Sequence, residues 1–337
     1  MIQIKKTPTI FAISLAASSF VTQAADSNGP NFYGKLYISM DLQKSEKKAD
    51  TTNSEPSHWA LNSRSSRIGI KQDIPLNDKI TAFYKGEMSV EVDDGDKGGK
   101  SFGQRDIYVG IKGNLGAVQA GRFSTPFRKT EGKIELFSLL DGEIDEVLGA
   151  QSRVSNIIQY STPTLANTVV SVSFQPNEED GKEPLKNAYS ASAVYNKDNL
   201  YAAIGLGKNI LSEKITTDIT PAQQSDRIQL AAKYQMGAAS FGAIFHHAQD
   251  ANDHSLKENA FVVNSSYRIN DYTLKAQYGL NKGKVTKNER SLAAVGVDYS
   301  LSKASFIGLN YIVVTDEQGS TKDITDKTLT FAYSLSF

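Results

Sequence analysis

Polar and apolar residues alternate along most of this chain. Between residues 32 and 43 one face of the pattern is wet and the other is apolar: Lys35, Tyr37, Ser39 and Asp41 against Leu36, Ile38, Met40 and Leu42. Successive side chains of a β-strand point to opposite faces, so this period of two predicts a strand with one wet face and one apolar face. Residues 227–236, 272–281 and 293–301 repeat the pattern.

Sixteen such segments can be counted, and each is about as long as the roughly 9–11 residues that cross a bilayer as a tilted strand. The alternation is imperfect in the third and fifteenth, where Phe83 and Phe306 fall on the wet face. The segments begin near Phe32, His58, Lys79, Phe102, Leu115, Arg153, Asn167, Asn187, Asn199, Asp226, Ala239, Glu258, Tyr272, Ser291, Ala304 and Lys327.

The connections between these segments alternate strictly in length. Seven short turns, rich in turn-forming residues, lie between eight long polar links. The short turns fall at residues 75–78, 113–114, 163–166, 197–198, 237–238, 270–271 and 302–303. This sorting predicts an antiparallel up-and-down meander with every long loop at one end, as in outer-membrane barrels, and nothing in a soluble sandwich requires it.

The wet faces carry Lys, Arg, Gln and Asp at several successive positions, too many to bury in a packed core. We therefore expect an all-β fold: a transmembrane antiparallel up-and-down β-barrel of 16 strands, with apolar faces toward lipid and polar faces toward water. Sixteen strands enclose an aqueous channel, whereas about eight would be filled by side chains. The alternative is a periplasmic β protein with one exposed sheet face.

The N-terminus has the pattern of a secretory signal peptide. Lys5 and Lys6 precede an apolar run at residues 10–21, and small residues follow at 22–24. We expect residues 1–24 to be removed and residues 25–337 to form a single barrel domain. The removed residues hold two lysines and no acid, so the 37 basic and 37 acidic residues of the chain leave a net charge of −2. That charge argues against nucleic acid as a partner.

The chain has no cysteine, so a large sheet or core rather than disulfides must hold an exported domain together. Beyond the signal peptide there is no run of about 18 apolar residues, which excludes helical membrane spans. A closed barrel remains possible, because it satisfies every backbone group within lipid. The expected location is therefore the periplasm or outer membrane of a Gram-negative cell.

One segment interrupts the alternation for about thirty residues, between Arg122 and Arg153. Its second half, residues 134–150, contains five acids and no basic residue. Residues 136–148 predict a short amphipathic helix with a glycine at 142. Long irregular segments within a regular β array are usually functional or disordered. We expect residues 123–152 to fold into the mouth of the barrel and narrow it.

Over nearly all of the mature chain, the sequence resembles the trimeric general-diffusion porins of Gram-negative outer membranes. The resemblance is carried by FYGK at 32–35, SRIGIK at 66–71, RDIYVGIKGNLGAVQAGR at 105–122, RVSNIIQYSTP at 153–163 and the terminal Phe337. It implies a 16-stranded barrel whose third loop forms a constriction. It also implies a homotrimer in outer-membrane lipid and lipopolysaccharide, without a cofactor or metal.

The resemblance assigns a basic cluster on the barrel wall to Lys35, Arg67, Arg105 and Arg153, with Arg122 close to it. Alternation supports Arg67, which shares a face with Ser65 and Lys71, and Arg153, which is opposite Val154 and Ile158. Arg105 fits less cleanly, because Ile107 and Val109 share its face. The alternative for each arginine is a position without a role in the pore, at a solvated strand end or as a snorkelling side chain.

The acidic side of the constriction is assigned as a group, because the loop lacks the Pro-Glu-Phe-Gly-Gly type segment common in the family. The group is Glu135, Asp141, Glu143 and Asp145. The alternative is a solvated acidic surface loop, since charge runs are usually only hydrated. Acids facing cations across a narrow gap would select ions by charge and orient dipolar solutes.

The expected function is passive diffusion of ions and small hydrophilic solutes, so the chain is not expected to be an enzyme. An outer-membrane lipase or protease would need a nucleophile with a base. The histidines are His58, His246, His247 and His254, none beside a nucleophile motif, and His246 and His247 should point to opposite faces. A surface adhesin or receptor role, resting on the long loops, remains open as a secondary function.

Overall fold

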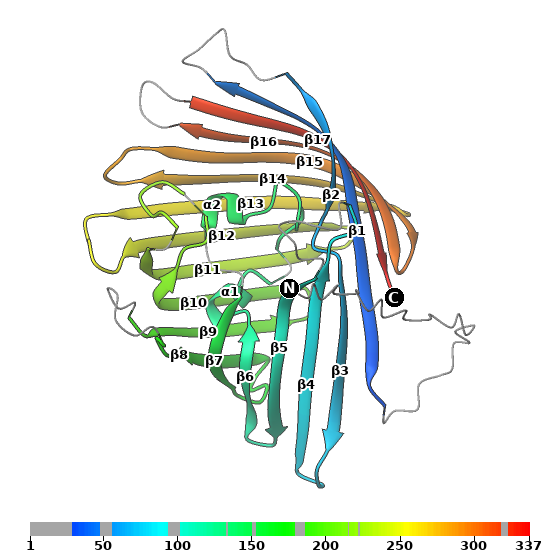
Figure 1. The fold of residues 1–337 in the computed structure, drawn as a ribbon, viewed down its shortest axis with the longest axis vertical. Helices are drawn as coiled ribbons and strands as arrows, with labels where there is room; N and C mark the ends of the chain where they lie inside the picture. The colour runs from blue at the N-terminus through cyan, green and yellow to red at the C-terminus, as the bar shows by residue number, and fades with distance from the viewer. Residues whose placement is uncertain are drawn as a thin grey trace, which may run out of the picture.

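The computed structural model describes residues 29–47, 56–93, 102–132, 134–149, 153–178, 186–214, 216–221, 223–317 and 323–337. The expected signal peptide, residues 1–24, lies outside the described residues. Within these ranges the chain forms one antiparallel sheet whose strands follow one another around a barrel (Figure 1).

The described residues form seventeen strands and two short helices. The strands are β1 (Asn31–Lys47), β2 (His58–Ser63), β3 (Arg67–Pro75), β4 (Ile80–Val90), β5 (Phe102–Gly113), β6 (Gly116–Phe123), β7 (Val154–Ser161), β8 (Thr168–Gln175), β9 (Ala188–Lys197), β10 (Leu200–Leu211), β11 (Gln224–Met236), β12 (Ala239–Asp250), β13 (Lys257–Ile269), β14 (Tyr272–Gly283), β15 (Glu289–Ser302), β16 (Ser305–Glu317) and β17 (Asp323–Ser336). The helices, α1 (Pro126–Lys129) and α2 (Asp145–Leu148), both fall between β6 and β7.

β2 and β3 are two halves of one barrel strand, so the predicted count of sixteen is confirmed. Both halves pair with β1. The break between them is flanked by the pair Ile38–Ser63 on the β2 side and the pair Lys35–Arg67 on the β3 side. The break between them contains Ser65, whose φ of 53° is left-handed and interrupts an extended strand. β1 also pairs with β17 along thirteen positions from Lys35 to Lys47, which closes the sheet on itself.

The predicted strand positions are confirmed closely, but two of the long links, expected at residues 282–290 and 315–326, are shorter than predicted. β14 continues to Gly283 and β15 begins at Glu289, so only residues 284–288 connect them. β16 and β17 likewise extend to Glu317 and back to Asp323. Polar residues whose sequence suggests a loop thus continue the strands, because pairing with the neighbouring strand satisfies their backbone N–H and C=O groups.

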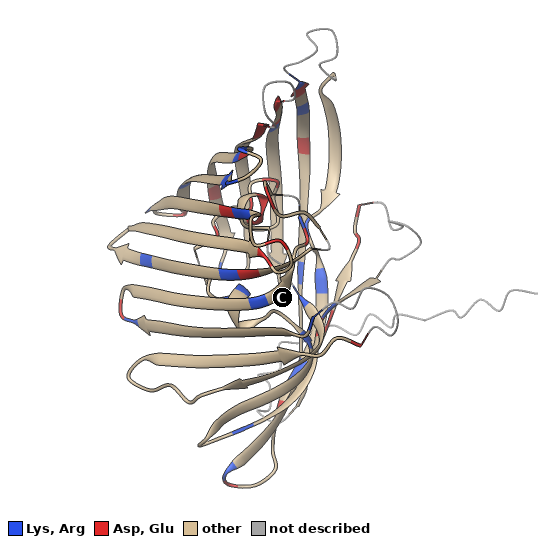
Figure 2. Cartoon of the chain, turned by 90° about the vertical axis from the view of Figure 1, so that its left-hand side faces the viewer, with Lys and Arg blue, Asp and Glu red and all other residues tan. Residues whose placement is uncertain are grey.

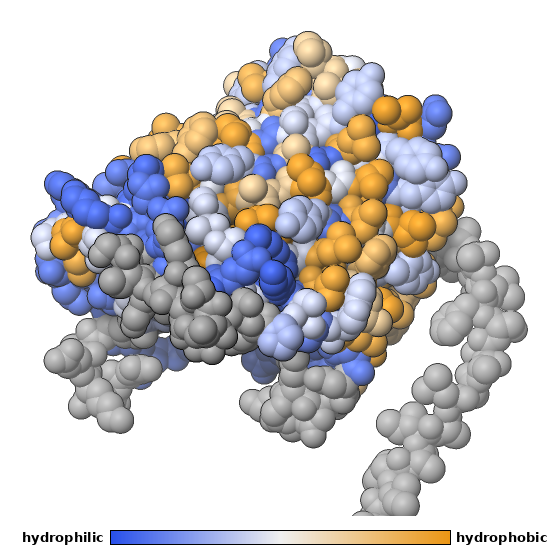
Figure 3. Space-filling model, turned by 90° about the horizontal axis from the view of Figure 1, so that it is seen from above, coloured by the Kyte–Doolittle hydropathy of each residue, from blue (hydrophilic) through white to orange (hydrophobic). Residues whose placement is uncertain are grey.

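The outer face of the barrel is apolar, as predicted. Leu206, Leu230, Phe245, Phe261 and Leu309 are among many large side chains that are exposed there. Figure 3 shows such apolar side chains spread over one flank of the barrel. An exposed apolar surface of this extent fits lipid better than water. None of the helices in the described ranges is long and apolar enough to cross a membrane.

The inner face is mixed, and charged residues gather around the segment that contains α1 and α2 (Figure 2). Phe83 and Phe306, which looked misplaced on the wet face, make aromatic contacts. Phe306 meets the ring of Tyr37 with centroids 5.9 Å apart, and Phe83 meets that of Tyr108 at 6.2 Å. The hydrophobic core therefore lies inside the barrel, where the segment between β6 and β7 covers part of the wall.

Candidate functional site

The segment between β6 and β7, residues 124–153, folds into the barrel and is called the inward loop. It starts at α1, where the side chain of Thr125 accepts a hydrogen bond from the backbone N–H of Arg128. This N-cap satisfies one of the N–H groups that a helix start leaves without a partner. At the other end of the loop, α2 ends at Gly149. The φ of Gly149 is 62°, a left-handed conformation that favours glycine and turns the chain back toward β7.

The helix expected over residues 136–148 is wrong except in its last turn. Leu139 has a φ of 69°, which breaks any right-handed helix there. The carboxylate of Glu135 accepts hydrogen bonds from the backbone N–H groups of Phe137 and Ile144, at 2.6 and 2.5 Å. A side chain that binds nearby backbone in this way favours turns over helix.

Apolar side chains attach the inward loop to the wall. Six of them are at most 3% exposed: Ile134, Phe137, Leu140, Ile144, Val147 and Leu148. They pack on apolar inner-wall residues of β11–β16, among them Ala231, Ile244, Val262, Leu292, Ala294 and Ile312. Since burial of one such side chain is worth about 1.5–3 kcal/mol, this contact holds the loop against one half of the barrel.

Glycines on that wall let the loop approach closely. A Cβ atom built on Gly279 would lie 2.9 Å from Cγ2 of Val147, and one on Gly242 would lie 3.0 Å from Cγ2 of Ile134. Carbon atoms in contact normally stay about 3.5–4.0 Å apart. A larger residue at either position would therefore push the loop away.

Amide side chains of the wall bind the backbone of the loop. These residues were not predicted from the sequence, although inward-facing amides at matching positions of the adjacent strands β13 and β14 could have indicated them. Asn264 donates to the carbonyl of Ile134 (2.6 Å), Gln277 to that of Gly142 (2.8 Å) and Asn281 to that of Val147 (2.7 Å). These bonds satisfy carbonyls that the irregular loop would otherwise bury unpaired.

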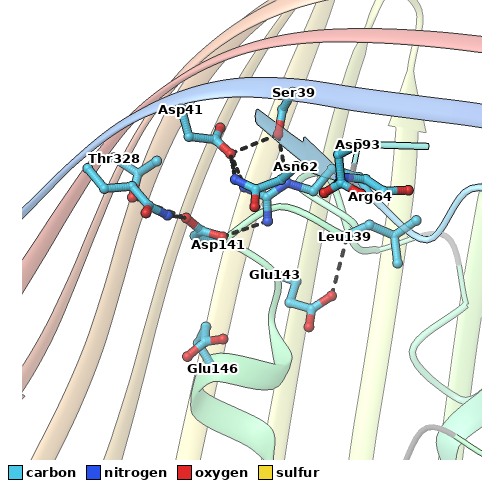
Figure 4. A network of polar contacts seen from close by, with 12 residues as sticks. Ser39, Asp41, Asn62, Arg64, Asp93, Leu139, Asp141, Glu143, Glu146 and Thr328 are labelled. Atoms are coloured by element: carbon cyan, nitrogen blue, oxygen red, sulfur yellow. Dashed lines mark hydrogen bonds and ion pairs between the residues drawn. The ribbon is translucent and has the colours of Figure 1, made fainter. Parts of the chain in front are cut away.

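The carboxylate of Asp141 joins the loop to the wall near β1 and β17 (Figure 4). Arg64, in the break between β2 and β3, pairs with Asp141 at 2.7 Å and with Asp41 at 2.5 Å. Gln43 and Thr328 also donate to Asp141, at 3.1 and 3.2 Å. Burial opposes ionisation of this carboxyl, but Arg64 outweighs it and keeps the pKa of Asp141 below its usual range.

Two further loop acids bind cations at the long-loop end. Lys214 lies 3.0 Å from Glu143 and also contacts Glu146. Arg290 pairs with Glu146 at 2.6 Å. Burial lowers the proton affinity of Lys214, but the two acids overcome it and raise its pKa to about 12.

Glu135 and Asp145 bind groups of the inward loop itself. Burial raises the pKa of Glu135 to about 7, although the two backbone N–H groups that it accepts from act in the opposite direction. Asp145 is 5% exposed and pairs with Arg128 of the same loop at 2.5 Å. Burial also raises the pKa of Asp145, against the attraction of that guanidinium.

A second loop, residues 212–223, also folds inward and is called the bracing loop. The buried carboxylate of Glu258 accepts a hydrogen bond from the Thr216 hydroxyl at 2.7 Å and from backbone N–H groups of the bracing loop. Asp218 accepts from backbone N–H groups of the connection at residues 284–288. From sequence this segment is an ordinary long polar link, and only its contacts show that it supports the inward loop: the Glu213 N–H donates to the carbonyl of Gly149, and Lys214 pairs with Glu143.

Four of the five predicted wall cations come together on β1, β3 and β5 and just before β7. With Lys85 of β4 and two acids they form the wall cluster: Lys35, Arg67, Lys85, Arg105 and Arg153 around Glu87 and Asp106. Glu87 lies 2.7 Å from Arg105, 3.2 Å from Lys85 and 3.8 Å from Arg67. Asp106 lies 2.6 Å from Arg153 and 2.7 Å from Lys85. The cluster has five cations and two acids.

A β-bulge explains why Arg105 did not fit the alternation. The register between β4 and β5 shifts between Gly86 and Met88, so Glu87 faces both Arg105 and Asp106. An extra residue on one strand of a pair re-aims the side chains next to it. Both Arg105 and Asp106 therefore contact inward-facing residues, whereas Ile107 returns to the outer face.

Irregular pairing also changes the faces of β7. Asn156 has a φ of 58°, and the register to β6 shifts beside it. Val154, which alternation placed opposite Arg153 on the apolar outer face, is instead buried in a cluster with Phe123. Arg122 makes no ion pair with the acids of the wall cluster in the described structure and donates to the hydroxyl of Ser155 at 3.0 Å.

Three cations near the inward loop make no ion pair with a carboxylate among the described residues. Lys35 lies over the ring of Tyr37, 4.5 Å from its centroid. Arg122 binds only the hydroxyl noted above, and Lys129 lies 3.3 Å from the amide oxygen of Gln159. By contrast, Asp141, Glu143 and Asp145 each have a cationic partner.

The histidines do not form a catalytic site in the described structure. His246 is fully buried, 3.1 Å from Gln229 and against the ring of Phe127. His247, on the other face as predicted, contacts Asn259. Across the described ranges, no group of three or more His, Asp or Glu side chains is arranged to hold a metal ion.

The chain is similar in sequence to major outer membrane proteins of Neisseria. The chain is 21% identical over 327 residues to a major outer membrane protein P.IB of Neisseria gonorrhoeae, with 88% of each chain covered. A P.IA protein of Neisseria meningitidis is 26% identical over 201 residues, or 59% of this chain and 46% of that one.

Solved structures share the fold. An anion-selective porin from Comamonas acidovorans superposes with a TM-score of 0.76 at 19% identity, over 92% of this chain and 99% of that one. A trimeric form of OmpT from Vibrio cholerae gives 0.68 at 16% identity, over 93% of this chain and 100% of that one. The sequence profile described as Gram-negative porin matches residues 11–317. With its closed 16-stranded barrel and inward loop, the chain belongs to the Gram-negative porin family and is a non-enzymatic channel of the outer membrane.

Proposed function

We propose that the inward loop and the wall cluster form a charged constriction through which ions and small hydrophilic solutes diffuse. The observation that carries this proposal is the gathering of five cations around two acids on one wall, while apolar packing holds the loop on the other. Fixed charges at a narrow aqueous passage select ions, and low-dielectric walls strengthen their field.

The constriction favours anions. Lys35, Arg122 and Lys129 have no carboxylate partner among the described residues, and the wall cluster has a net excess of three positive charges. Of the predicted acids, Glu135 binds backbone N–H groups of the loop and Asp145 is buried against Arg128 of the loop, so Asp141 and Glu143 are the ones that act on the passage. Both already pair with cations, Arg64 and Lys214. The similar porin from Comamonas acidovorans is described as anion-selective, which supports the same direction.

The channel is a homotrimer in outer-membrane lipid and lipopolysaccharide. The structurally similar OmpT of Vibrio cholerae is described in a trimer form. The apolar outer faces supply surface for both lipid and neighbouring subunits. Aromatic pairs on the outer face, such as Tyr272 with Tyr299 at 4.8 Å between centroids, are suited to the membrane interface.

The experiment is a reversal potential in a salt gradient. Arg67, Arg105 and Arg153 are changed together to Ser, which removes three wall cations. The expected result is a fall in the chloride-to-potassium permeability ratio of at least about twofold, since the field at the constriction weakens.

The matched control removes three cations from short turns, with Lys79, Lys197 and Lys303 changed to Ser. These residues are exposed and lie far along the chain from the inward loop. The control should keep the wild-type ratio. An unchanged ratio in the wall variant, or equal shifts in both variants, would remove the wall cluster from the constriction.

A further inference from the structure

A recess of mixed lining lies on the short-turn side of the inward loop. It has a volume of about 760 Å³, within the roughly 300–1,000 Å³ of typical small-molecule sites. Lys129 and Gly132 of the inward loop line the recess on one side, and residues of β6–β11 line it on the other. None of the wall-cluster residues lines it, whereas Lys129, which also contributes positive charge to the constriction, does.

A row of hydroxyl and amide groups runs across the wall of this recess, beside the apolar side chains of Val169, Val194 and Leu200. Neighbouring strands place them side by side, with Gln119 opposite Gln159, Ser161 opposite Ser171, and Ser171 opposite Ser192. Gln159 donates to the Ser161 hydroxyl at 2.9 Å, and the hydroxyls of Ser161 and Ser171 are 2.8 Å apart. Such groups both donate and accept hydrogen bonds, as the hydroxyls of a solute require.

Lys129 supplies a positive charge at the upper edge of the recess. Its ammonium lies 3.3 Å from Oε1 of Gln159, a neutral partner, whereas the preceding Arg128 is engaged by Glu131 and Asp145. The Tyr201 hydroxyl donates to the carbonyl of Thr130 at 2.8 Å, which fixes the chain next to Lys129. Lys233 also lines the recess, and Asp198 is the one carboxylate among its lining residues.

We propose that the recess is a binding subsite for polyhydroxylated monocarboxylates of the sugar-acid class. Lys129 pairs with the carboxylate, and the row of hydroxyl and amide groups binds the hydroxyls. Charge-assisted hydrogen bonds are about twice as strong as neutral ones, so the carboxylate orients the solute. The proposal rests on the channel function and adds a binding step on the short-turn side.

The test is current through single channels in planar bilayers, with gluconate, acetate or glucose added on the short-turn side. Gluconate should interrupt the current at lower concentration than either of the others, because only gluconate has both the charge and the hydroxyls. Lys129→Gln should weaken the gluconate effect by about tenfold, which corresponds to the loss of one charge-assisted contact. Ser171→Ala with Ser192→Ala should reduce the preference for gluconate over acetate.

Lys71→Gln is the control, because Lys71 is a cation near the short-turn end that contacts the ring of Tyr33 and does not line the recess. It should retain the wild-type response to gluconate. Equal responses to the three solutes, or equal weakening by Lys129→Gln and Lys71→Gln, would overturn the subsite. Open-channel conductance in potassium chloride is recorded in the same experiment, so failure of the subsite is distinguished from failure of the channel.

Discussion

At the residue scale, Glu135 and Asp141 show that acids of one loop can have different roles. Asp141 binds Arg64 on the wall, which favours its charged form. Glu135 accepts hydrogen bonds from the backbone N–H groups of Phe137 and Ile144. The carboxyl group of Glu135 therefore stabilises the fold of the loop. The charged carboxylate of Asp141 can instead influence ions in the passage.

The raised pKa of Glu135 predicts a pH-dependent loop. Its pKa is about 7 in the folded loop and 4.5 ordinarily, so the folded loop binds the proton more tightly than the detached loop. Stability of the folded loop is therefore full below about pH 4.5 and is lost as the pH rises toward 7. Hydrogen exchange, corrected for intrinsic rates, should show protection of the Ile144 amide falling by at least about tenfold between pH 5 and pH 8.

Glu135→Gln is the matched variant, because it keeps an acceptor and removes the titration. Its protection should vary less with pH than that of the wild type, with the buried Asp145 accounting for what remains. Amides of β9 and β10 serve as internal references. The same pH dependence in both proteins would rule out Glu135 as its source.

At the element scale, the inward loop is placed by the wall that it covers. Gly279 admits Val147, with a built Cβ only 2.9 Å from that side chain. Gly279→Leu should displace α2 and increase both open-channel conductance and current noise, since part of the passage is freed. Overpacking of this kind usually costs about 1–3 kcal/mol.

Gly86→Leu provides the control for that change. A Cβ atom on Gly86 meets only Ile70, at an ordinary 3.6 Å. The added side chain would point toward lipid, between the inward-facing Lys85 and Glu87. Wild-type conductance in this variant, together with an altered Gly279→Leu channel, supports the packing of the loop, and two unaltered channels contradict it.

The bracing loop gives a second prediction at this scale. Glu258→Ala leaves the Thr216 hydroxyl and the backbone N–H groups of the loop without their acceptor, at a cost of about 1–3 kcal/mol for each buried group left unpaired. The loop should open more often, so trypsin should cut after Lys214 faster than in the wild type. Asp253→Asn, in a neighbouring exposed loop, should leave that cleavage rate unchanged. Equal rates in wild type and Glu258→Ala would show that the carboxylate does not hold the loop.

At the scale of the whole molecule, the strands could be predicted because the two solvents of a membrane barrel impose a strict period of two. Lipid on one side and water on the other set the pattern of β1, β11, β14 and β15 directly. The pattern fails where the inner wall is covered by protein instead of water. Ile244, Leu292 and Ile312 face inward because the inward loop packs on them, and a single strand does not reveal that contact.

The candidate site could be predicted only in part for the same reason. Lys35 and Arg67 follow regular alternation, and the register of β1 and β3 makes them neighbours. Arg105 depends on a bulge, which is a property of the pair of strands and cannot be read from either strand alone. The partners of Glu143 and Glu146 are Lys214 of the bracing loop and Arg290 of β15, about 70 and 140 positions away along the chain, where the local pattern holds no information.

The measurement that tests the central claim most directly is the conductance of the purified protein in planar bilayers. A water-filled barrel predicts stepwise increases in current after the protein is added, and a homotrimer predicts that the steps occur in groups of three. The account is contradicted if the folded protein inserts and the current stays at the level of the bare bilayer.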